Sequence, residues 1–125
     1  MPLQVSLPSQ WTLAIGNNQF LNLGPFIDGT TIASATPYYV NDLTITVSLY
    51  LNRNLQNPSA TPGTLVIQWL PGYIGGSNGL YQATISNTFS PVPYLSYALV
   101  IDAPLSPSGY QYHAEFPCSV VVRNS

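Results

Sequence analysis

The part of the sequence that comes nearest to a catalytic pattern is GGSNG at residues 75–79, followed by Asp102 and His113. It matches the G-x-S-x-G signature of a nucleophilic serine, here Ser77, with an acid and a base behind it in the chain order of α/β-hydrolases. In those enzymes the serine lies on a turn that leads from a strand into a helix. Residues 80–86 alternate like a strand instead, so the pattern favours a hairpin turn over a serine nucleophile.

The other reactive side chains form no recognisable site. The single cysteine, Cys118, is in phase with Phe116 and Val120, which predicts a small core side chain without an intrachain disulfide. His113 alternates with polar neighbours, which predicts a surface imidazole. One histidine and one cysteine make no zinc ligand set, and the four acidic residues form no calcium-loop motif. We therefore predict no catalytic residue, no cofactor site and no metal site.

Charge is scarce along the whole chain. Only 5% of the 125 residues are charged, against about 25% in ordinary soluble domains. Two basic residues cannot neutralise a phosphate backbone or hold an anionic lipid surface, and no apolar run reaches the roughly 18 residues of a membrane span. These observations exclude nucleic acid and membrane as partners. The charged residues are Asp28, Asp42, Asp102, Glu115, Arg53 and Arg123.

Most of the chain follows a period of two, which is typical of half-buried β-strands. No window shows a helical period, and twelve prolines and nine glycines interrupt the chain. We predict one all-β domain over residues 1–125, an antiparallel sandwich of about 7–8 strands with residues 1–10 as a candidate N-terminal arm; a barrel is the alternative. The expected strands are residues 3–7, 11–15, 19–23, 42–52, 64–73, 80–86, 94–102 and 110–123.

The alternation also predicts which side chains face the core. Pro117 interrupts the last expected strand and lacks an N–H, which indicates an edge position or a bulge. The side chains expected to face inward include Leu65, Ile67, Trp69, Tyr81, Ala83, Ile85, Leu95, Tyr97, Leu99 and Ile101.

The composition resembles that of a protein interface. The chain has nine tyrosines and no lysine, and tyrosine is enriched at interfaces where Lys, Glu and Asp are depleted. Sheet edges without lysine are also prone to pair with other chains. We therefore expect a homo-oligomer whose surface contacts other proteins. Tyr81 and Tyr97 are in phase with core residues, whereas five others are less clearly inward: Tyr38, Tyr39, Tyr50, Tyr73 and Tyr94.

The second half of the chain resembles a known family. The stretch GGSNGLYQATI within residues 66–85, a Tyr97-x-Leu-x-Ile strand and the closing CSVVVR are similar to the small immunoglobulin-like proteins found among the virion genes of tailed bacteriophages. The resemblance covers about residues 41–123, and the chain departs from it in carrying almost no charge. It implies an immunoglobulin-like sandwich and a structural role in capsid decoration, in the neck, or in the tail and baseplate.

We therefore expect a non-enzymatic bacteriophage structural protein. The leading hypothesis is a capsid decoration or cement protein that stabilises the shell. A neck, tail or baseplate component is the first alternative. A carbohydrate-binding sandwich that uses exposed tyrosines and Trp11 is the second. MPLQVSLPSQ has no positive n-region, so we expect no signal peptide, synthesis in the host cytoplasm and location in the virion. Alternating Leu3, Val5 and Leu7 lead us to expect an arm that adds a strand to a neighbour's sheet.

Overall fold

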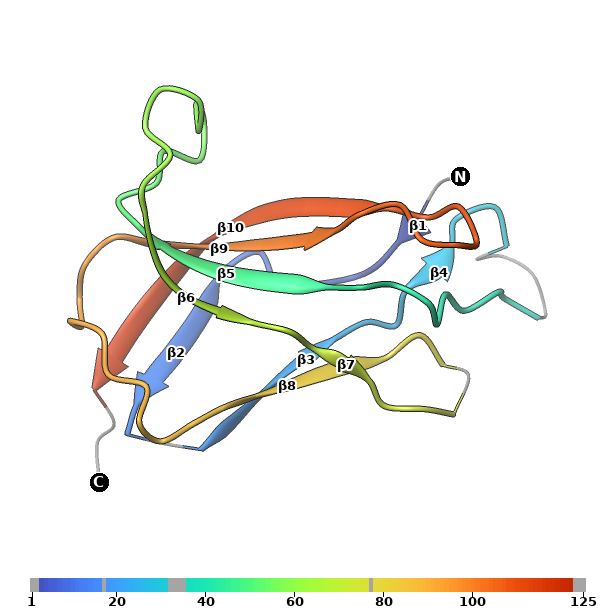
Figure 1. Cartoon of the computed structure of the whole chain (residues 1–125), viewed down its shortest axis with the longest axis horizontal. Coiled ribbons are helices and arrows are strands. Elements are labelled where there is room, and N and C mark those ends of the chain that lie inside the picture. Colours follow the sequence, from blue (N-terminus) through green and yellow to red (C-terminus); the bar gives the residue numbers. More distant parts are fainter. Residues whose placement is uncertain (1–2, 17, 32–35, 77, 123–125) are drawn as a thin grey trace.

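The computed structural model describes residues 3–16, 18–31, 36–76 and 78–122. Within these ranges all regular secondary structure is β-strand, which confirms the predicted all-β sandwich (Figure 1). Ser77, Arg123 and the first two residues of the expected arm lie outside the described residues. The strands are β1 (Leu3–Gln4), β2 (Trp11–Ile15), β3 (Gln19–Leu23), β4 (Ile27–Asp28), β5 (Thr46–Leu51), β6 (Thr64–Trp69), β7 (Gly72–Tyr73), β8 (Tyr81–Ile85), β9 (Tyr97–Ala103) and β10 (Tyr112–Val122).

The strands form a five-stranded sheet in the order β2-β10-β9-β5-β6, a three-stranded sheet β3-β8-β7 and a two-stranded sheet β1-β4. In Figure 1, β3, β8 and β7 run through the lower part of the molecule and β9 and β5 cross above them, while β10 runs from the upper part down to the lower left. All strand pairs are antiparallel except β2 and β10, which run parallel from Trp11 opposite Cys118 to Ile15 opposite Val122.

The hydrophobic core lies between the sheets. Val47 and Leu49 of β5 and Leu99 and Ile101 of β9 are fully buried, and Tyr81 of β8 is 1% exposed. Alternate residues of these strands point to the same face, so the predicted inward positions Tyr81 and Ile85 of β8 and Leu99 and Ile101 of β9 are buried, while Ala83 is half-buried. The buried residues that pack together in this core are Leu13, Leu21, Leu23, Phe26, Val40, Leu43, Ile45, Val47, Leu49, Trp69, Tyr81, Ile85, Phe89, Tyr97, Leu99, Ile101, Ala103, Tyr110, Cys118 and Val120.

The expected strand 64–73 is divided between two sheets. Its first part, β6, is an edge of the five-stranded sheet, and its continuation β7 pairs with β8 in the three-stranded sheet. Pro71 lies between the two parts, where a residue without an N–H cannot extend a ladder. The chain therefore changes sheet at this point.

Two predicted inward residues are exposed. In β6 the register shifts between Leu49 and Tyr50 of β5: Ile67 lies opposite Leu49, but Leu65 lies opposite Tyr50. The extra residue, Val66, takes Leu65 out of phase with Ile67, so Leu65 is 47% exposed. Leu95 precedes β9 and is likewise exposed, because the strand begins only at Tyr97.

Pro117 lies in a central strand, so the predicted edge position is correct only locally. β10 is flanked by β9 and β2. Pro117 pairs with Ala98 of β9, and the ladder to β2 begins one residue later at Cys118. At Pro117 the strand therefore has a partner on one side only.

The N-terminal arm packs on its own molecule. Only Leu3 and Gln4 of the expected strand 3–7 are in a ladder, opposite Ile27 and Asp28 of β4. The side chains at positions 3, 5 and 7 are half-buried against the core, and those at 4 and 6 are exposed. The period of two is thus correct for the arm, although most of it has no strand partner.

Candidate functional site

Asp102 and His113, which the sequence places behind a serine, do meet in the structure. They are opposite residues of β9 and β10, and His113 Nδ1 lies 3.1 Å from Asp102 Oδ1. The other ring nitrogen, Nε2, lies 2.9 Å from Glu115 Oε2. Both nitrogens of the imidazole are therefore engaged by carboxylates. Segment 75–79 joins β7 to β8 in the other sheet, and the strand β8 follows it where a serine hydrolase needs a helix.

Glu115 also binds Arg53 through a two-point contact that the sequence did not reveal. Arg53 Nε and Nη2 donate to the two carboxylate oxygens at 2.7 and 3.1 Å, and Nη1 donates to the Pro62 carbonyl at 2.9 Å. The guanidinium lies 4.8 Å from the centre of the Tyr50 ring. Hydrogen bonds from Arg53 lower the pKa of Glu115, and the same contact raises the pKa of Arg53. Arg53, Glu115, His113 and Asp102 form one continuous charged network.

This network gives the fold a pH dependence. The hydrogen bond to Glu115, followed by that to Asp102, raises the pKa of His113 above 6.5. A raised folded-state pKa stabilises the fold below the unfolded pKa, and this contribution is lost as the pH rises through the folded value. We expect the melting-temperature difference between the native chain and His113→Gln to be larger at about pH 5.5 than at about pH 8.5.

Thermal unfolding followed by circular dichroism measures this difference, which is modest because the His113 side chain is 54% exposed. Gln111→Asn, an exposed change near the start of the same strand, is the control and gives a difference that does not vary with pH. A difference for His113→Gln that stays constant between the two pH values contradicts the role of the imidazole.

The other two described acids fasten loops to the sandwich. Asp28 is buried, and its carboxylate accepts hydrogen bonds from the Tyr110 hydroxyl at 2.7 Å and from the Thr30 hydroxyl at 2.7 Å. The Tyr110 contact is the main cause of the lowered pKa of Asp28, and the same contact raises the pKa of Tyr110 to about 12. Asp42 accepts from the backbone and hydroxyl of Ser108.

The ionised side chains thus all have partners within the molecule, as far as the described residues extend. In that part of the chain no group of three or more His, Cys, Asp or Glu side chains is placed to hold a metal ion. In the network His113 itself occupies the space between Asp102 and Glu115. Cys118 is buried, and desolvation raises the pKa of its thiol to about 12, so the reactive thiolate does not form at neutral pH.

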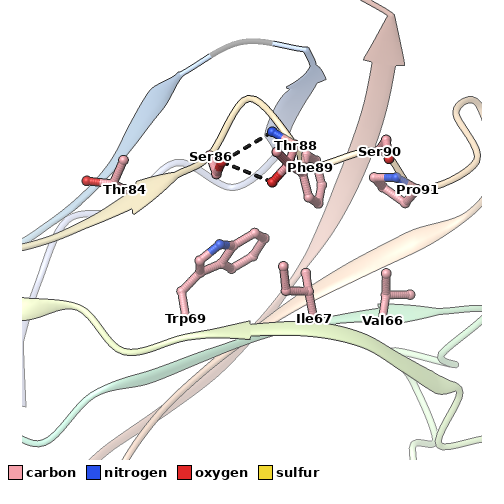
Figure 2. A pocket seen from close by; sticks show the side chains of 9 residues that line it. All are labelled: Val66, Ile67, Trp69, Thr84, Ser86, Thr88, Phe89, Ser90 and Pro91. Carbon is pink, nitrogen blue, oxygen red and sulfur yellow. Dashed lines mark hydrogen bonds between the residues drawn. The ribbon is translucent and has the colours of Figure 1, made fainter.

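An apolar groove lies between the edges of the two larger sheets, where β6 faces the end of β8. It encloses about 410 Å³ between β6 and the segment that leaves β8. Figure 2 shows Val66, Ile67 and Trp69 on one wall, facing Phe89 and its neighbours on the other. The centres of the Trp69 and Phe89 rings, one from each wall, are 5.6 Å apart. Every residue that lines the groove is uncharged: Val66, Ile67, Trp69, Thr84, Ser86, Thr88, Phe89, Ser90 and Pro91.

Large apolar side chains are also exposed elsewhere on the surface. Tyr94 is 72% exposed and Leu70 is 74% exposed. Trp11, considered above for sugar stacking, is instead half-buried against Phe116, with ring centres 6.0 Å apart. The exposed set comprises Phe20, Tyr38, Leu65, Val66, Leu70, Tyr73, Ile74, Val92, Tyr94, Leu95, Leu105 and Val122. Among the described residues no helix is long and apolar enough to span a membrane.

Comparisons with known proteins correct the expected family. No protein-family model matches the chain, and no curated protein matches its sequence. Among solved structures, CopC from Methylosinus trichosporium OB3b is similar, with a TM-score of 0.46 and 12% identity over 94% of this chain and 89% of that chain. The resemblance to immunoglobulin-like phage virion proteins is therefore wrong.

The motifs behind that resemblance have a general structural cause. Gly79 has a positive φ of 66° and lies against the backbone of Phe26, while Tyr97, Leu99 and Ile101 alternate into the core. A glycine turn before a hairpin strand and an alternating central strand are requirements of many β-sandwiches. The motifs therefore identify the sandwich and not a family.

Proposed function

We propose that the chain is a non-enzymatic structural protein that works as a subunit of a larger protein assembly. The observation that carries this proposal is the combination of an almost uncharged chain with twelve exposed large apolar side chains among the residues that the structure describes. The five described charged residues are already held by partners within the chain. Docking of another protein on most of this surface removes water from apolar groups and leaves no charge without a partner.

The assembly that we propose is a bacteriophage virion, in which copies of the chain decorate and stabilise the capsid. A protein that binds only the assembled lattice stabilises it by mass action, and this requires apolar contact area but no catalytic group. Placement in the neck, tail or baseplate uses the same surface chemistry. The two placements differ in copy number, because a decorated lattice offers many more binding positions than a ring.

Self-association of the purified chain tests the first part of the proposal. We expect sedimentation velocity to show oligomers whose fraction rises with concentration, because the exposed apolar groups are buried between copies. Charge is not the driving force, so the same distribution is expected at low and high salt. A chain that stays monomeric at high concentration contradicts the proposed role as an assembly subunit.

Quantitative mass spectrometry of purified virions tests the second part. A copy number near that of the major shell protein, or a fixed fraction of it, is the result expected for capsid decoration. A number many times smaller places the chain in a neck or tail ring. Absence of the chain from the particles contradicts the virion proposal, whatever the purified chain does in solution.

A further inference from the structure

In the three-stranded sheet, part of β8 lacks a neighbouring strand on the side that faces β6. β7 pairs with β8 only at Gly72 opposite Gln82 and Tyr73 opposite Tyr81. The rest of β8, residues 83–85, has no strand on that side in the described part of the chain. The outer edge of β6 is open as well. Two sheet edges therefore flank the apolar groove, each with backbone groups available for pairing.

The burial pattern of β6 shows that one of its core-facing side chains is not covered. Ile67 lies opposite Leu49 and in phase with Trp69, so it points toward the core side of the sheet. Leu49 is fully buried and Trp69 is 8% exposed, yet Ile67 remains half-exposed at the wall of the groove (Figure 2). A strand placed beside residues 83–85 would face Ile67 and cover it.

We propose that this groove receives residues 3–7 of a second copy of the chain as an additional strand beside β8. This inference rests on the proposed role as an assembly subunit. The groove is lined by uncharged residues, so binding of an uncharged strand buries no unpaired charge. Residues 3–7, LQVSL, are uncharged and alternate apolar with polar side chains, so one face of the added strand is apolar.

The length of residues 3–7 and their position in the molecule also agree with this proposal. Five extended residues span about 17 Å, enough to pass the open residues 83–85 of β8 and the Val66, Ile67 and Trp69 side chains on the opposite wall. In its own molecule the arm is held by a ladder of only two residues, and Val5 and Leu7 are half-buried without a strand partner. Figure 1 shows β1 toward the right of the view and β6 toward the left, and no residue of the arm lines the groove of its own molecule.

The resulting contact is heterologous, because the arm of one copy enters a different surface on the next. Such head-to-tail contacts build closed rings or open chains, according to the rotation between successive copies. Each copy offers one arm and one groove, so every copy in a ring is fully engaged.

Charge placed in the groove tests the proposal by sedimentation equilibrium. We expect Ile67→Glu to weaken self-association by about ten-fold or more, because the buried carboxylate finds no partner. Gln68→Glu is the matched control: it adds the same charge to the same strand at an exposed residue that faces the other way, where Gln68 bonds Ser48, and it leaves association within about two-fold. Val5→Asp in the arm, which leaves the groove intact, reproduces the effect of Ile67→Glu.

Disulfide trapping locates the contact. A chain with Val5→Cys is mixed with a differently tagged chain carrying Ile67→Cys, and oxidation is expected to join the two. Gln4→Cys, on the other face of the arm, is the control that joins poorly. The native Cys118 does not compete, since it is buried and its thiol stays protonated.

The outcomes separate the two proposals. If the native chain associates but Ile67→Glu and Val5→Asp associate equally well, the groove proposal is overturned and the assembly role stands. The same holds if the Gln4 and Val5 chains cross-link equally. If the native chain is monomeric, both are overturned. Thermal unfolding of each variant identifies any loss of association that comes from loss of the fold.

Discussion

Gly79→Ala is expected to lower the free energy of unfolding by about 3 kcal/mol or more. The residue has a φ of 66°, which costs a side-chain-bearing residue about 1–2 kcal/mol. In addition, a Cβ at this position would lie 2.5 Å from the carbonyl oxygen of Phe26. That carbonyl accepts from Val40 N, and Phe26 N donates to the Gly79 carbonyl. The backbone of Phe26 therefore cannot move away without breaking both hydrogen bonds.

Denaturant unfolding measures the loss, and Gly75→Ala is the matched control. Gly75 has a similar positive φ of 90° in the same turn, but a Cβ there meets nothing within 4 Å. The control therefore carries the conformational cost alone, about 1–2 kcal/mol. Equal losses in the two variants would show that the contact with Phe26 contributes nothing.

Tyr81→Phe is expected to destabilise the fold by about 2 kcal/mol. The Tyr81 hydroxyl donates to the Val40 carbonyl at 2.8 Å and accepts from Leu43 N at 3.2 Å. All three residues are buried. Removal of one oxygen therefore leaves a carbonyl and an amide in the core without a partner, and water cannot readily replace the hydroxyl.

The control for Tyr81 is Tyr94→Phe, the same chemical change at a side chain that is 72% exposed. Its hydroxyl is 3.5 Å from Val122 N, at the limit of a hydrogen bond, and water is available to both groups. We expect a change within about 0.5 kcal/mol. A loss for Tyr81→Phe no larger than that of the control would refute the role of the buried hydroxyl.

Local alternation was enough to predict the strands that cross the core, because one buried face leaves a period of two in the sequence. Val47 and Leu49, or Leu99 and Ile101, are buried as that period requires. The prediction failed where a strand begins later than the alternation suggests, as at Leu95, and where a nonlocal event changes the phase. The bulge opposite Leu49 is one, and it turned Leu65 outward without any glycine or proline at that position to mark it.

The groove and the charged network were beyond prediction for a different reason. Arg53 and Glu115 are 62 residues apart, and their meeting depends on the order of the strands. The groove likewise exists because the chain leaves the five-stranded sheet after Trp69, which leaves part of β8 without a neighbour. In contrast, the alternation of Leu3, Val5 and Leu7 was visible at once, and only the structure supplies a surface that fits it.

The parallel pairing of β10 with β2 has a consequence for biosynthesis. β10 is made after the other nine described strands, yet it occupies an inner position of the five-stranded sheet, between β2 and β9. While a ribosome is still translating residues 112–122, β9, β5 and β6 can already pair with one another, but β2 cannot join them because β10 is the strand that lies between. The edges of β2 and β9 that pair with β10 stay available to chaperones and to neighbouring nascent chains until translation has passed Val122.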